Sequence, residues 1–218
     1  MTERKEWPIA ASWPALALAG VLVGAFAAQR SAGVDRVIGR IGFIPGDLFE
    51  GRFDTAVLSI FIDGGWSLIL VTVAFTLAFS IPVSRRMGRD FKGVTAFLVF
   101  FLACGILGNV GYALLDPGGA HPSVGASGAI AGMMGASSRL FGRPDDLAPY
   151  RSPTVIGMAA AWIAVNVLFQ FLSAGWTPIA WQAHIAGYAA GLFLISPALS
   201  LIGRARPDEG ADDHGIEN

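Results

Sequence analysis

Six long apolar segments constrain this chain more than any other feature of its sequence. A helix of about 20 apolar residues crosses the hydrocarbon core of a bilayer, and no alternation of apolar and polar residues indicates strands. Only 14% of the 218 residues are charged, against about 25% in soluble domains. The sequence predicts an all-α polytopic membrane protein, with six transmembrane helices at roughly residues 9–29, 65–83, 93–115, 127–141, 153–173 and 178–202.

We expect one membrane domain, residues 1–203, followed by a disordered cytoplasmic tail, residues 204–218. Arg4 and Lys5 before the first apolar segment also fit a signal peptide, but this segment is long enough to span and five more follow it. With the N-terminus inside, the inside regions hold 11 of the 15 Lys and Arg residues. Positive charges favour the cytoplasmic side, so both termini are predicted in the cytoplasm, and a bacterial inner membrane is the expected location.

The first connection, residues 30–64, is long and contains apolar stretches such as "IGFIPGDLF". A solvated linker would be more polar, so we expect this loop to lie partly in the membrane interface. An ordinary extracytoplasmic loop with a short helix is the alternative.

Composition excludes several classes of function. The net charge of −1 gives no basic surface for nucleic acid. The lone Cys104 can form neither an internal disulfide nor a thiolate cluster. No metal and no cofactor is expected.

The fourth apolar segment is short, and it begins with Ser127 in "PSVGASGAIAGMMGA". Its 15 residues reach about 22 Å, whereas the hydrocarbon core is about 30 Å thick. With Arg139 and Arg143 holding its far end at the cytoplasmic surface, its first turn lies about 8 Å below the outer surface. A helix N-terminus presents free N–H groups that stabilise a developing oxyanion. The alternative is a capping serine above a packing face of Gly128, Gly132 and Ala136.

A serine nucleophile needs a base, and His184 lies within the sixth apolar segment. Six residues past Pro178, it lies about 9 Å from the outer end, close to the predicted depth of Ser127. Gly187 and Gly191 share one face of the helix and allow a close approach to a neighbour. A polar tether to a backbone carbonyl is the alternative for His184. No Asp or Glu within a span is placed to orient the ring, which favours a Ser–His dyad over a triad.

Gly125-Ala126-Ser127-Gly128 at the start of a short fourth span, with His184-x-x-Gly187-x-x-x-Gly191 in the sixth, resembles the rhomboid intramembrane serine proteases. The resemblance covers about residues 10–203. It implies a six-helix bundle and cleavage of transmembrane protein substrates in the lipid bilayer. Ser127 would be the nucleophile and His184 the general base. Gly125 would shape the loop around an oxyanion hole formed in part by the Ser127 N–H.

The chain departs from the family pattern near the start of the second span. Family members commonly carry a histidine and, four residues later, an asparagine that help to bind the oxyanion; Ser67 and Val71 stand there in this chain. Ser67 retains one donor and Val71 has none. An aromatic residue frequent four residues after the nucleophile is Ala131 here. Asn109, Asn166 and Gln170 are candidate replacement donors, although hydrogen bonding between helices is the more common role for such residues.

Two other membrane functions compete with proteolysis. A catalytically weak rhomboid-like protein that binds transmembrane clients is favoured by Ser67 and Val71 and disfavoured by the presence of both Ser127 and His184. A transporter or channel would need polar residues lining a path through several spans, and the sequence lacks such a path, because apart from His184 no charged residue lies centrally in a span. A soluble hydrolase with a nucleophile elbow is excluded, because position 129 is Ala rather than Gly.

Overall fold

The computed structural model describes residues 12–143, 146–172 and 180–205, and these residues form helices without any extended strand. The long helices are α1 (Trp13–Ala32), α5 (Trp66–Met87), α6 (Phe91–Leu115), α8 (Pro153–Leu172) and α9 (Trp181–Leu201). Each of these five helices overlaps one of the six predicted spans. Four of them, α1, α5, α6 and α9, have the length and hydropathy needed to cross a membrane. The protein is a polytopic helical membrane protein.

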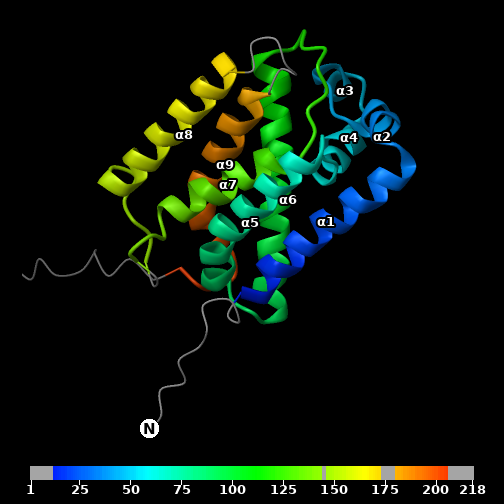
Figure 1. The fold of residues 1–218 in the computed structure, drawn as a ribbon. Coiled ribbons are helices and arrows are strands. Elements are labelled where there is room, and N and C mark those ends of the chain that lie inside the picture. The colour runs from blue at the N-terminus through cyan, green and yellow to red at the C-terminus, as the bar shows by residue number, and fades with distance from the viewer. Residues whose placement is uncertain (1–11, 144–145, 173–179, 206–218) are drawn as a thin grey trace, which may run out of the picture.

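The helix α7 (Ser127–Ser138) lies at the centre of the bundle and packs against α5, α6, α8 and α9 (Figure 1). Every α7 residue after Ser127 is buried. Glycine, alanine and serine predominate in α7 because only small side chains let several helices approach one axis this closely. Its 12 residues reach about 18 Å, which is well short of the hydrocarbon thickness.

The predicted cytoplasmic end of this span was wrong in two respects. The sequence predicted a helix to Phe141, but the chain leaves the helix after Ser138 and turns, with Gly142 at φ 73°. Arg139 does not lie at the surface of the protein. It is buried, and its guanidinium donates to Ala148 O (3.0 Å) and to the Tyr150 hydroxyl (3.1 Å). The arginine thus fixes the following loop beneath α7.

The long first loop folds into short helices at one end of the bundle. They are α2 (Val34–Ile41), α3 (Pro45–Phe49), α4 (Phe53–Leu58) and the 3-10 turn η2 (Ser59–Phe61). Phe49 and Phe53 are more than half exposed, so this part of the chain keeps apolar side chains at its surface. Its placement in the membrane interface stays a prediction.

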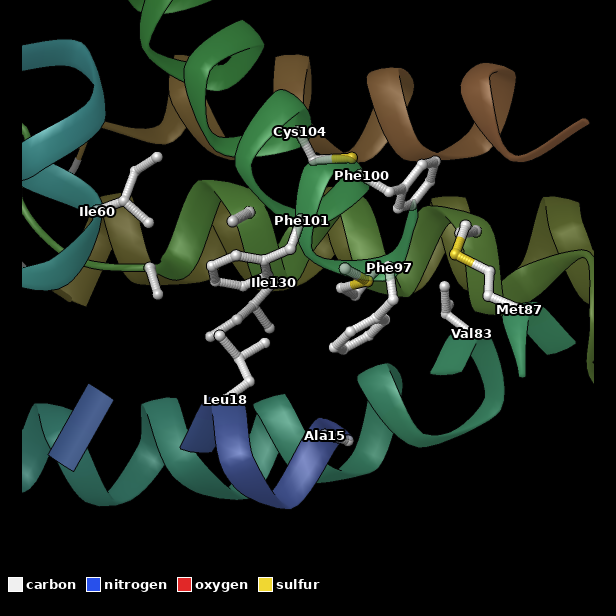
Figure 2. Close-up of a cluster of buried hydrophobic side chains, with 14 of the residues drawn as sticks. Ala15, Leu18, Ile60, Val83, Met87, Phe97, Phe100, Phe101, Cys104 and Ile130 are labelled. Atoms are coloured by element: carbon white, nitrogen blue, oxygen red, sulfur yellow. The ribbon is translucent and has the colours of Figure 1, made fainter. Parts of the chain in front are cut away.

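The apolar core lies between α1, α5, α6, α7, α9 and η2. Phe97 and Phe101 of α6 are fully buried beside Leu18, Ile60 and Ile130, and Figure 2 shows these side chains converging from separate helices. Dispersion contacts between such close-packed side chains, rather than exclusion of water, hold helices together in lipid. This core holds η2 and the start of α7 in place.

Candidate active site

Ser127 is the first residue of α7, and a sharp turn delivers it there. Gly125 has φ +104°, a conformation that residues with a Cβ rarely adopt. The Gly125 N–H donates to Ser59 O (2.9 Å), so η2 holds the turn. Ala126 occupies the N-cap position, and no side chain caps α7. The capping alternative for Ser127 is therefore wrong, and its hydroxyl is available for another partner.

That partner is His184, in the first turn of α9. The Ser127 Oγ and His184 Nε2 atoms lie 2.9 Å apart, and both residues are half-buried. A hydroxyl at this distance from an imidazole nitrogen has the geometry that general-base activation needs.

Glycines bring α7 and α9 close enough for this contact. A Cβ on Gly187 would lie 2.1 Å from Gly128 O, and a Cβ on Gly191 would lie 1.8 Å from Gly132 O. Both distances are far below van der Waals contact with rigid backbone. Gly128, Gly187 and Gly191 thus form the contact between the two helices, one and two turns below His184.

The other ring nitrogen of His184 contacts a residue to which the sequence interpretation gave a different role. His184 Nδ1 lies 2.8 Å from Oδ1 of Asn166, a buried residue of α8. The sequence carried a signal for this contact. Asn166 lies six residues before the end of α8, so it is about 9 Å from that end, and the sequence estimate gave His184 the same distance from the end of its own segment.

An aromatic ring also contacts the histidine, and it comes from α8 rather than from α7. The family's aromatic position is Ala131 here, which is fully buried. The Trp162 ring of α8 lies 5.8 Å from the His184 ring, tilted by 46°, and Trp162 Nε1 donates to His184 O at 3.5 Å. Trp162 supports the histidine from the side of α8.

The two positions where the family commonly carries its oxyanion-binding pair are exposed in this chain. Ser67 and Val71 lie on the exposed side of α5, whose buried side carries Ile69 and Thr72. Within the described part of the chain, Ser67 forms no side-chain hydrogen bond with Ser127 or His184. The replacement role considered for Asn109 is wrong, because its amide group already donates to Ala56 O (2.9 Å) and Ser59 Oγ (3.0 Å). Gln170 is exposed.

Asn109 instead anchors the loop that precedes the nucleophile. Its Oδ1 accepts from Ser123 Oγ (3.0 Å), and Ser123 exchanges both backbone hydrogen bonds with Phe43. The loop before α7 is thereby tied to α6 and to the first loop. Among the residues that the structure describes, no cluster of three His, Cys, Asp or Glu side chains has the arrangement of a metal site.

Comparison with known proteins agrees with this architecture. Residues 50–200, well over half of the chain, match the family model described as the Rhomboid domain. No curated protein sequence matches the chain. The match spans α4 to α9, the elements that carry Ser127 and His184. The chain belongs to the rhomboid family of membrane proteins.

Proposed function

We propose that this protein is an intramembrane serine endopeptidase that cleaves transmembrane protein substrates. The observation that carries the proposal is the 2.9 Å contact between Ser127 Oγ and His184 Nε2. Ser127 lies in the first turn of α7, a buried helix of only 12 residues. Rhomboid proteins act in general on transmembrane substrates in a lipid bilayer. We further propose that α7 and α8 complete a six-span domain, with both termini in the cytoplasm of a bacterial cell.

The chemistry follows from the positions of the two side chains. His184 Nε2 takes the hydroxyl proton as Ser127 Oγ attacks the scissile carbonyl carbon. The N–H groups of the first turn of α7 have no partner within the helix, and they stabilise the oxyanion that forms. His184 then gives the proton to the leaving amine, and the peptide C–N bond breaks. Water then attacks the acyl carbon as His184 Nε2 takes one of its protons. The ester C–O bond breaks, the carboxylic acid product leaves, and His184 returns the proton to Ser127 Oγ.

The test is cleavage of a transmembrane substrate by purified protein in liposomes. Wild type is expected to release product, and Ser127→Ala and His184→Ala are each expected to lower the rate by at least about 10³-fold. Cleavage that persists in Ser127→Ala would exclude Ser127 as the nucleophile. Ser137→Ala is a matched control, because Ser137 lies on the same helix and its hydroxyl donates to Phe79 O instead.

Binding of transmembrane clients without efficient cleavage is the second candidate function. The identities of Ser67 and Val71 favour it, because they stand where family members commonly carry a histidine and an asparagine that bind the oxyanion. Loss of one oxyanion donor lowers rates by about 10²–10³-fold. A wild type that binds a transmembrane helix but gives no product, and gains activity in Ser67→His with Val71→Asn, would favour this reading.

A further inference from the structure

Asn166 occupies a position that fixes both ends of its amide group. It is buried on α8, with only 6% of its surface exposed. Its Nδ2 donates to Trp162 O at 2.8 Å, and its Oδ1 lies 2.8 Å from His184 Nδ1. The opposite orientation of the amide would place Oδ1 against the Trp162 carbonyl oxygen, two acceptors facing each other. The contact with Trp162 therefore assigns Oδ1 to the histidine.

This assignment determines where the proton of the neutral imidazole lies. An amide oxygen only accepts, so His184 Nδ1 must carry the hydrogen. A neutral imidazole has one N–H, so Nε2 then holds a lone pair. That lone pair faces Ser127 Oγ at 2.9 Å. Every contact in this series pairs a donor with an acceptor, from Trp162 O through Asn166 and His184 to Ser127.

We propose that Asn166 is a positioning residue that holds His184 in the Nδ1–H tautomer, with Nε2 directed at Ser127. It takes the orienting place that a carboxylate occupies in a Ser–His–Asp triad, but it is neutral and is supplied by α8. This proposal deepens the proposed function. The effect of Asn166 on catalysis rests on that function, whereas its effect on the tautomer of His184 does not. The sequence favoured a dyad because no Asp or Glu was available, and an amide performs the same selection without a buried charge.

The same contact makes α8 part of the site. Ser127 and His184 come from α7 and α9, which glycines pack tightly, whereas α8 contributes Asn166 and Trp162. Asn166 contacts the ring Nδ1 of His184, and Trp162 contacts its backbone carbonyl. Movement of α8 away from α9 would release the ring from its acceptor and permit the other tautomer.

The experiment measures the tautomer directly. Purified protein labelled with ¹⁵N-histidine is examined by NMR, and the signals of His184 are identified by their loss in His184→Ala. In wild type we expect a protonated Nδ1 and an unprotonated Nε2. In Asn166→Leu, which keeps the size of the side chain, we expect this preference to be lost. Val167→Leu, at an exposed neighbouring position, is expected to match wild type. A wild-type His184 protonated at Nε2 would overturn the proposal, whether or not the variants fold.

A second readout separates positioning from a merely structural role. The rate at which a fluorophosphonate modifies Ser127 is expected to fall about 10²-fold in Asn166→Leu and to recover in Asn166→Asp, because a carboxylate also accepts from Nδ1–H. Equal losses in both variants, with the wild-type tautomer retained, would overturn the proposal. If wild type does not react at all, the proposed protease fails, and the tautomer measurement still decides the role of Asn166.

Discussion

At the scale of single residues, a turn positions Ser127 and two hydrogen-bond partners orient His184. Ser127 follows a turn that needs a positive φ at Gly125. His184 is held from both sides, by Ser127 at Nε2 and by Asn166 at Nδ1. Ser127 has no role in capping, so its hydroxyl is directed only to the histidine.

Replacing Gly125 with alanine tests the turn. A Cβ there would meet nothing closer than 3.8 Å, so the expected loss of about 1–2 kcal/mol in stability comes from the backbone conformation alone. Reaction of Ser127 with a fluorophosphonate should slow as the turn relaxes. Thermal unfolding in detergent and the labelling rate measure the two effects. Gly20→Ala on α1, where a Cβ meets open space, should leave the labelling rate unchanged and should not lower stability, because alanine favours a helix interior over glycine; equal behaviour of the two variants would contradict this role for Gly125.

At the scale of helices, the contact between α7 and α9 sets the distance between nucleophile and base. The glycines of both helices face the carbonyl oxygens of the other helix. This arrangement has no room for a methyl group, because the nearest atoms belong to rigid backbone. Helix α8 contacts α9 through Asn166 and Trp162, which both form polar contacts with His184.

Gly191→Ala tests this contact two turns away from His184. The new Cβ would lie 1.8 Å from Gly132 O, so the helices must separate, at an expected cost of about 1–3 kcal/mol. Separation by even 1 Å lengthens the contact between Ser127 and His184, and activity should fall by about 10²-fold. Unfolding and cleavage assays measure both losses. Gly157→Ala on α8, with open space at its Cβ, is the control; wild-type cleavage by Gly191→Ala would refute the account of the glycine contact.

At the scale of the whole molecule, polar contacts tie the ends of helices that are distant in sequence. Near the first loop, the Gln29 amide exchanges hydrogen bonds with the backbone of Asp63, and Thr72 Oγ1 donates to the Asp63 carboxyl group at 3.0 Å. At the other end, the Arg204 guanidinium is paired with Asp90 between α5 and α6. These contacts join α1 to α5 near the first loop and the end of α9 to the start of α6 at the other end.

The buried Asp63 predicts how stability changes with pH. Burial raises the pKa of its carboxyl group above the ordinary value of 3.8. The unfolded chain therefore releases this proton at lower pH than the folded protein does. The contribution of Asp63 to stability is fully present below pH 3.8 and is lost as pH rises through the folded pKa. Asp63→Asn should show a smaller decrease in unfolding temperature over that interval; an identical pH dependence in the variant would contradict the prediction.

Much of the fold could be predicted from the sequence, because helix formation in lipid depends on local hydropathy. Each of the six predicted segments contains a helix, and the fourth was expected to be short. The end of that helix could not be read from the sequence, because Arg139 was expected at the surface and instead binds Ala148 O. The number of spans stays a prediction for α7 and α8, which do not meet the length and hydropathy requirement in their described residues.

The candidate site was predictable in part for the same reason. Depth along a helix follows from residue number, and this estimate put Ser127 and His184 at one level; the structure places their Oγ and Nε2 atoms 2.9 Å apart. The direction in which a side chain points around a helix depends on tertiary packing. For that reason the exposed side of Ser67, the occupied amide of Asn109 and the contact of Asn166 with the histidine ring were not foreseen. The catalytic roles stay predictions.

The most direct measurement of the central claim is covalent modification of the purified protein by a fluorophosphonate, mapped by mass spectrometry. An activated serine reacts, whereas ordinary serines do not. We predict one adduct, on Ser127, that is absent in Ser127→Ala and at least about 10²-fold slower to form in His184→Ala. No adduct on wild type, or an adduct on Ser127 that forms equally fast without His184, would contradict the account of Ser127 as a nucleophile activated by His184.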